Sequence, residues 1–250
     1  MIGIFDSGTG GLSVFKEIRR LLPEEKYIYY SDNAHCPYGE KSREYIIERS
    51  RTITKFLLEN GCDIIVVACN TATAAAIAAL REEFPVRFIG MEPAVKPAVK
   101  TTKTGVVGVL ATAGTLKADK YLNTRERFSE GVRITEHVGQ GFVELVEKGC
   151  LTGPEAESIV KASLKPLLDD GADRIVLGCT HYPFLWETIS KTAAELYPDR
   201  EIEIIDPAPA VARHLLEIMK QEGIIRNEGF SITLHSSGDS KILKETFDRL

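Results

Sequence analysis

The chain lacks the features by which membrane, exported and nucleic-acid-binding proteins are recognised. No apolar run approaches the roughly 20 residues that cross a bilayer, and residues 1–5 lack the basic stretch and small-residue cleavage site of a signal peptide. Lys and Arg total 31 against 36 Asp and Glu, and no basic run or aromatic-interleaved patch occurs, so attraction to phosphates is not favoured. We therefore expect a cytoplasmic protein that binds neither a membrane nor a nucleic acid.

Cysteine pairs are missing as well. The chain has an odd number of cysteines, none of them in a C-x-x-C pair: Cys36, Cys62, Cys69, Cys150 and Cys179. Without an export signal, this set argues against a disulfide framework, and it gives no basis for a zinc ribbon or a thioredoxin-type redox site. We expect free thiols and no metal site.

The sequence is rich in short apolar runs, which alternate with segments whose apolar residues recur at the spacing of an α-helix. The 250 residues are 44% hydrophobic, enough for one large or two small globular units. Strands are expected over residues 2–5, 27–30, 64–67, 88–89, 106–110, 134–137, 175–177 and 202–205. Helices are expected over residues 12–22, 45–60, 73–84, 141–147, 154–169, 184–196 and 208–221. This alternation predicts an α/β fold with parallel sheets covered by helices.

The chain also repeats itself. GIFDSG at 3–8 is echoed by GVLATA at 108–113, VVACNT at 66–71 by VLGCTH at 176–181, and EPA at 92–94 by DPA at 206–208. Because the blocks keep their order, we expect two similar parallel-sheet α/β domains related by an internal pseudo-twofold repeat, with the active site in the cleft between them. The first domain should comprise residues 1–97 plus 208–250, with a tail strand over 230–234, and the second residues 98–207.

Cys69 and Cys179 occupy matched places in this repeat, each at the end of an apolar strand and near a helix start. Ligands of open α/β sheets bind beyond the carboxyl ends of the strands, and a helix N-terminus favours thiolate. Two opposed thiols suit removal of a proton from one face of a carbon and its replacement from the other, as in a two-base racemase or epimerase. A free cysteine is often a small buried hydrophobe, but the recurrence favours catalysis. Cys36, Cys62 and Cys150 have no matched partner and are assigned structural roles.

Two further features lie near these strand ends. DSGTGG at 6–11 joins a strand to a helix, so its backbone can cradle an anion while Asp6 projects towards a ligand. It is not a dinucleotide fingerprint, and a glycine-rich turn with Asp6 capping the helix is an equal alternative. His181 can relay a proton or hold the charge state of Cys179, although a lone histidine is more often structural. Metal binding by this pair would need further clustered ligands, which the sequence does not show.

Four motifs in order, DSGTGG at 6–11, PYG at 37–39, ACNTA at 68–72 and GCTHYP at 178–183, closely resemble those of the glutamate racemases in the aspartate/glutamate racemase superfamily. The resemblance implies cofactor-independent interconversion of L- and D-glutamate, supplying D-glutamate for peptidoglycan, by a protein that commonly forms a homodimer. It also implies that Cys69 deprotonates D-glutamate and Cys179 L-glutamate, with Asp6 assisting the first and Glu147 and His181 the second. The substrate-binding residues that it implies are Asp6, Ser7, Pro37, Tyr38, Gly39, Asn70, Thr71, Thr73, Thr112, Thr180 and His181.

Several alternatives stay open. Glu147 can instead be a solvated carboxylate on a helix face, and an aspartate racemase is the nearest rival activity. A two-lobed amino-acid-binding protein would share the fold without needing the cysteines. A thiol-dependent acyl-transfer enzyme would use one cysteine with His181. No lysine occupies a matched position for a Schiff base, so catalysis is expected to rest on oriented donors in a closed, water-poor cleft.

Overall fold

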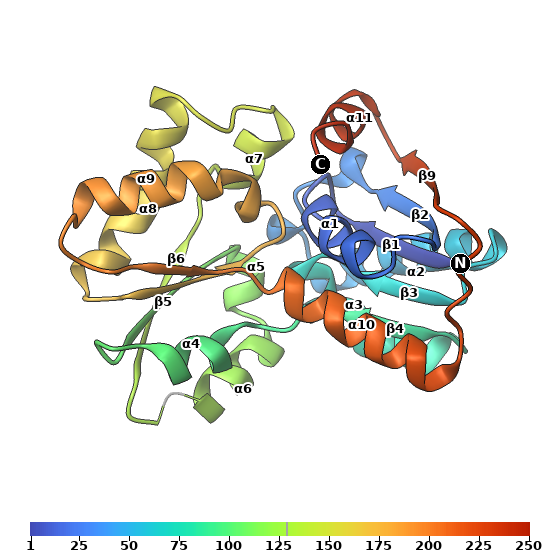
Figure 1. The fold of residues 1–250 in the computed structure, drawn as a ribbon, viewed down its shortest axis with the longest axis horizontal. Helices are drawn as coiled ribbons and strands as arrows, with labels where there is room; N and C mark the ends of the chain where they lie inside the picture. Colours follow the sequence, from blue (N-terminus) through green and yellow to red (C-terminus); the bar gives the residue numbers. More distant parts are fainter. Residues whose placement is uncertain (129) are drawn as a thin grey trace. The chain divides into compact units, whose positions relative to one another are not determined.

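The computed structural model describes residues 1–128 and 130–250, which fold into two compact units (Figure 1). The first unit consists of Met1–Met91 and Ala208–Leu250, and the second of Glu92–Pro207. The chain enters the second unit earlier than the expected residue 97, because α4 (Val95–Thr101) packs on strands of the second sheet, with Val95 and Ala98 in its core. It returns to the first unit at Ala208.

The first unit is a parallel sheet covered on both faces. Its strand order is β4-β3-β1-β2-β9, with β1 (Ile2–Asp6), β2 (Lys26–Ser31), β3 (Ile64–Val67), β4 (Arg87–Gly90) and β9 (Ser231–Ser236). Helices α1 (Leu12–Leu21) and α10 (Ala208–Glu222) pack together, as do α2 (Arg43–Glu59) and α3 (Asn70–Glu83). The 3-10 turns η1 (Asn33–His35) and η2 (Tyr38–Glu40), and α11 (Lys241–Phe247), complete the unit. Every residue of β1 and β3 is buried, as expected for central strands of a covered parallel sheet.

The second unit repeats this plan around its own sheet. Its strand order is β6-β5-β7-β8, all parallel, with β5 (Val106–Ala111), β6 (Arg133–Val138), β7 (Arg174–Gly178) and β8 (Glu203–Ile205). On one face lie α4 and α6 (Asp119–Phe128), and on the other α8 (Pro154–Asp169) and α9 (Trp186–Leu196). The shorter helices are α5 (Ala113–Leu116), α7 (Phe142–Glu147) and the 3-10 turn η3 (Tyr182–Leu185).

The two sheets have the same topology. Reading β5, β6, β7 and β8 as the counterparts of β1, β2, β3 and β4, the order β4-β3-β1-β2 becomes β8-β7-β5-β6. The predicted pair of similar parallel-sheet α/β domains is therefore confirmed. The tail strand β9 lies parallel to β2 at the edge of the first sheet, so the end of the chain does return to the first unit.

The structure contains helices that the sequence pattern did not predict. The longest of these, α6, buries only Tyr121 and is otherwise mostly polar, so it carries too weak an apolar stripe to be recognised. Helices α4 and α11 are short. Within the described residues, no helix is long and apolar enough to cross a membrane.

Candidate active site

Each sheet has one point where the strand order reverses, and a cysteine lies there in both units. In the first unit the reversal falls between β1 and β3, and Cys69 follows β3. In the second it falls between β5 and β7, and Cys179 follows β7. The carboxyl end of the sheet at such a switch point is the usual ligand site of an open α/β sheet. The matched positions of the two cysteines are thus matched places in the fold.

Cys69 is the N-cap residue of α3. Its Sγ accepts a hydrogen bond from the backbone N–H of Ala72 at 3.4 Å and lies 3.9 Å from the hydroxyl oxygen of Ser7. The side chain is only 4% exposed. A thiolate in this position is stabilised by the free N–H groups and positive end of a fourteen-residue helix. The first unit therefore holds Cys69 where a negative sulfur is favoured.

The residues after Cys69 provide the polar lining of this helix end. Asn70 and Thr71 are nearly fully buried. The Oδ1 atom of Asn70 is buried and has no hydrogen-bond partner within the described part of the chain. Thr73 differs, since its hydroxyl donates to the Val67 carbonyl at 3.1 Å and accepts from the Met91 N–H at 3.1 Å. Because its only proton is committed, Thr73 holds two strand ends together rather than donating to a ligand.

Asp6 ends β1 and is fully buried beside the glycine-rich loop. Its Oδ2 accepts hydrogen bonds from the backbone N–H groups of Gly8 at 3.2 Å and Gly11 at 3.0 Å. Gly11 is the N-cap residue of α1, so these bonds fit the turn-capping interpretation of Asp6. The same bonds fix the carboxylate at the end of β1, one residue before Ser7.

The Pro37-Tyr38-Gly39 segment forms the start of η2 in the first unit. Pro37 is its N-cap residue, Tyr38 is buried and Gly39 is partly exposed. The Tyr38 hydroxyl donates to Asp32 Oδ2 at 2.5 Å. Burial, with the adjacent Asp32 carboxylate, raises the pKa of Tyr38 far above its ordinary value, so the phenol stays protonated as a donor.

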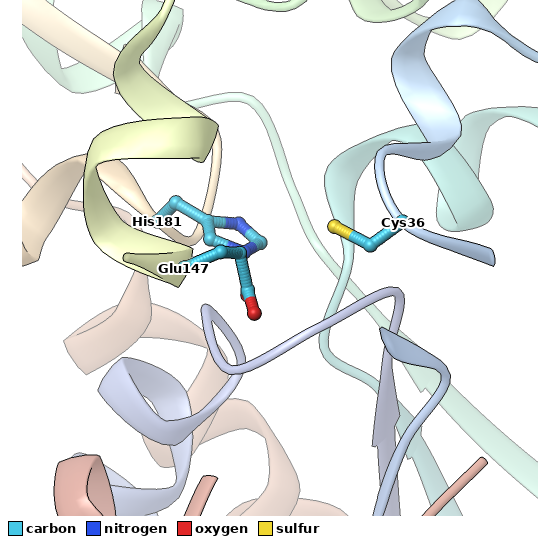
Figure 2. A group of neighbouring side chains, drawn as sticks. All are labelled: Cys36, Glu147 and His181. Carbon is cyan, nitrogen blue, oxygen red and sulfur yellow. The ribbon is translucent and has the colours of Figure 1, made fainter. Parts of the chain in front are cut away.

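Cys179 is held differently from Cys69. A 3-10 turn, not an α-helix, follows it, and α9 begins only at Trp186. Instead, Cys179 Sγ lies 3.8 Å from His181 Nδ1, and His181 Nε2 lies 2.7 Å from Glu147 Oε1. Figure 2 shows the Glu147 and His181 side chains next to each other. An imidazole that is paired with a carboxylate therefore lies beside this thiol.

Glu147 lies at the end of α7 and is neither fully solvated nor fully buried, with its side chain 20% exposed against 2% for His181. Tyr182 ties α7 to the Cys179 loop. Its ring packs on Phe142, and its buried hydroxyl donates to the Gly139 carbonyl at 3.3 Å. Burial, with Cys179 adjacent, raises the pKa of Tyr182, so this phenol also stays a donor.

The remaining predicted residues lie at the equivalent edge of the second sheet. Thr112 follows β5 as the N-cap residue of α5, and its hydroxyl accepts from the Thr115 N–H at 3.3 Å. Thr180 is 3% exposed and follows Cys179. The predicted residues thus form two sets. The set in the first unit is Asp6, Ser7, Pro37, Tyr38, Gly39, Cys69, Asn70, Thr71 and Thr73, and that in the second is Thr112, Glu147, Cys179, Thr180 and His181.

The structure adds two residues that the sequence analysis did not find. Asp32 is fully buried after β2 and accepts two hydrogen bonds from Arg49 of α2, at 2.8 and 2.9 Å, as well as the bond from Tyr38. Burial acts to raise the pKa of Asp32, but the hydrogen bonds from Arg49 and Tyr38 outweigh it and hold the pKa below its ordinary value. No spacing in the sequence indicates this pairing.

Comparison with known proteins agrees with this geometry. The family model described as Asp/Glu/Hydantoin racemase matches residues 2–215. The chain is 48% identical over 240 residues to the glutamate racemase of Ectopseudomonas mendocina, covering 95% of this chain and 89% of that protein.

Two solved structures have the same fold over nearly the whole chain. The crystal structure of glutamate racemase isoform RacE1 from Bacillus anthracis gives a TM-score of 0.88 at 34% identity, covering 100% of this chain and 92% of that one. The Escherichia coli glutamate racemase, solved with L-glutamate and the activator UDP-MurNAc-Ala, gives 0.85 at 34% identity, covering 99% and 94%. The chain belongs to the Asp/Glu/Hydantoin racemase family of isomerases.

Proposed function

We propose that this protein is a glutamate racemase that interconverts L- and D-glutamate without a cofactor, using Cys69 and Cys179 as two bases. The observation that carries the proposal is the presence of a buried thiol at the switch point of each of two topologically equivalent sheets. The names of the curated relative and of the solved structures support glutamate as the substrate. In keeping with the resemblance, we propose a cytoplasmic homodimer that supplies D-glutamate for peptidoglycan.

In the proposed reaction the two thiols act on opposite faces of the substrate α-carbon. With D-glutamate, the Cys69 thiolate takes the α-proton, and the Cys179 thiol gives its proton to the other face. The products are L-glutamate, a Cys69 thiol and a Cys179 thiolate. With L-glutamate the roles are exchanged, which is why both groups must reach both protonation states.

The groups around Cys69 support binding of an amino acid. The N–H groups at the start of α3 and the hydroxyls of Ser7 and Thr71 are suitable donors to a carboxylate. An unpartnered buried acceptor costs about 1–3 kcal/mol, and the substrate ammonium would satisfy Asn70 Oδ1. We propose that Asp6, held at the end of β1, assists proton transfer at Cys69.

The groups around Cys179 support a second acid or base. His181 can carry the positive charge that stabilises a Cys179 thiolate, and Glu147 would stabilise that imidazolium through the bond to Nε2. Thr112 and Thr180 would complete the substrate contacts on this side. The carbanion-like transition state is then stabilised by oriented donors in a water-poor site.

Solvent deuterium incorporation tests this proposal. The purified protein is incubated with L- or D-glutamate in D2O, and deuterium at the α-carbon is followed for the parent, Cys69→Ser and Cys179→Ser. We expect racemisation with exchange in the parent, impaired α-proton abstraction from D-glutamate in the Cys69 variant, and the opposite preference in the Cys179 variant. No exchange with either enantiomer would exclude glutamate racemisation.

Three further experiments separate the alternatives. Competition between glutamate and aspartate identifies the preferred substrate. Faster turnover of aspartate would make aspartate, not glutamate, the proposed substrate. Covalent labelling by an acyl donor, with one cysteine dispensable, would favour acyl transfer instead. Sedimentation equilibrium tests the homodimer.

A further inference from the structure

A buried charged network lies behind the Tyr38 turn of the first unit. Asp32 is 0% exposed, and its two carboxylate oxygens accept from Nη2 and Nε of Arg49 in a bidentate pair. The Oδ2 atom also accepts from the Tyr38 hydroxyl. Hydrogen bonds of 2.5–2.9 Å thus join Arg49 of α2 to Asp32, and Asp32 to Tyr38 of η2.

This network is connected to the groups around Cys69. The backbone N–H of Asp32 donates to the Asp6 carbonyl at 2.9 Å. The Tyr38 ring belongs to the same buried cluster as Cys69 and Ala72, and η2 contacts α3. A thiolate at Cys69 would also act to raise the pKa of Tyr38. The Tyr38 turn is therefore part of the surroundings of this thiol.

We propose that Arg49 and Asp32 are positioning residues for the substrate-binding turn: Arg49 holds the Asp32 carboxylate, which holds the Tyr38 hydroxyl and so fixes the Tyr38-Gly39 segment beside Cys69. This inference rests on the proposed function and on the assignment of Tyr38 and Gly39 to glutamate binding, which the family resemblance implies. It adds residues that touch no substrate themselves and act through Tyr38.

A buried carboxylate is costly unless it is paired. Without Arg49, Asp32 would be a buried anion with only neutral donors, and removing one partner of such a pair is strongly destabilising. The carboxylate would then draw in water or move, and Tyr38 would lose its fixed acceptor. A loosely held binding turn must be ordered by the substrate at each binding event, which weakens binding.

The test compares Arg49→Met and Arg49→Lys with a matched control on the same helix. Arg51 of α2 makes a similar two-pronged pair with Glu83, its Nε lying 2.7 Å from Glu83 Oε2, but both side chains are 36% exposed. Arg51→Met therefore removes the same kind of ion pair away from Tyr38. KM and kcat are measured with both glutamate enantiomers for each protein.

We expect KM to rise about tenfold or more for both enantiomers in Arg49→Met, less in Arg49→Lys, and not at all in Arg51→Met. A tenfold rise corresponds to about 1.4 kcal/mol of binding. A merely structural role would lower the fraction of folded protein, which reduces the apparent kcat and leaves KM unchanged. The split between KM and kcat therefore separates the two roles.

A double-mutant cycle with Tyr38→Phe tests whether Arg49 acts through Tyr38. If it does, Arg49→Lys raises KM in the parent but much less in the Tyr38→Phe background. Tyr38→Phe keeps the aromatic ring and Arg49→Lys keeps the positive charge. The cycle can therefore be measured even where Arg49→Met does not fold. Equal effects in both backgrounds, or a parent-like KM in both Arg49 variants, would overturn the inference alone. A parent that does not turn over glutamate would overturn the proposed function and this inference with it.

Discussion

Glu147 Oε1 lies 2.7 Å from Nε2 of His181, whose Nδ1 is the nitrogen that faces the Cys179 thiol. The imidazole is 2% exposed, so its charge depends on these two neighbours more than on solvent. Cys69, by contrast, accepts a hydrogen bond from the Ala72 N–H at the start of α3. The two sulfur atoms thus have different neighbours, so substitutions can change the surroundings of one cysteine without changing those of the other.

Replacing Glu147 by Gln should slow the step in which Cys179 takes a proton. The neutral amide cannot stabilise a His181 imidazolium as a carboxylate does, a loss of about 1.5–3 kcal/mol for a charged hydrogen bond. We expect α-proton abstraction from L-glutamate to fall about 10- to 100-fold. The measurement is deuterium exchange into each enantiomer separately.

Glu144→Gln is the matched control, because Glu144 is an exposed carboxylate on the same helix α7. It should leave both exchange rates near those of the parent. Equal slowing of both enantiomers in Glu147→Gln, or no slowing at all, would contradict the assignment of Glu147 to the Cys179 side.

Gly139→Ala should disturb the second unit near Cys179. An added Cβ would overlap the Tyr182 hydroxyl and lie 2.6 Å from the ring carbon Cζ. Because Tyr182 is fully buried, it cannot swing out, and overpacking of this kind costs about 1–3 kcal/mol. We expect a lower unfolding free energy and reduced turnover, measured by urea titration and racemisation.

Gly105→Ala provides the comparison for Gly139→Ala. Gly105 has φ of 72° and open space around its Cβ position, so its substitution adds backbone strain without a clash. Its stability loss should be about 1 kcal/mol, with turnover per folded molecule unchanged. If Gly139→Ala retained full turnover per folded molecule, Tyr182 would have no influence on the Cys179 loop.

The strands and the two cysteine positions could be predicted because they depend on local sequence. Buried parallel strands such as β1 and β3 are unbroken apolar runs, and each cysteine follows such a run directly. The repeat then indicated that the two strand ends are equivalent. These features need no knowledge of which distant segments meet.

The contacts of the side chains could not be predicted in the same way. Arg49 and Tyr38 both reach Asp32 only because α2 and the η2 turn come together in the fold, and charged residues on a helix usually face solvent. Glu147 and His181 come from α7 and the loop after β7, 34 positions apart. The sequence also predicted a helix start near Cys179, whereas the structure has a 3-10 turn after this cysteine and α9 begins at Trp186.

Cys62 should make the protein less stable in alkali. Burial raises the pKa of its thiol from 9.0 to about 11. Between these values the folded protein keeps a proton that the unfolded chain releases, so the unfolding free energy falls as pH rises. Urea titrations of the parent and Cys62→Ala under reducing conditions should give a stability difference that shrinks from about pH 9 to about pH 11. A difference that stays constant over this range would show that the Cys62 thiol titrates alike in both states.

Glu25 should hold the connection between α10 and the tail strand β9. Its side chain is 2% exposed, and Oε1 accepts from the backbone N–H groups of Arg226 at 2.7 Å and Asn227 at 3.0 Å. Glu25→Ala removes the charged acceptor of both donors, and a hydrogen bond to a charged group contributes about 1.5–3 kcal/mol. We therefore expect the unfolding free energy to fall by about 2–4 kcal/mol, with a smaller loss in Glu25→Gln, which keeps an acceptor oxygen.

Glu24→Ala, at the exposed neighbouring position, should change stability by no more than about 0.5 kcal/mol. Urea titration of the three variants measures these differences. Equal stability of Glu25→Ala and Glu24→Ala would mean that Glu25 does not hold this connection.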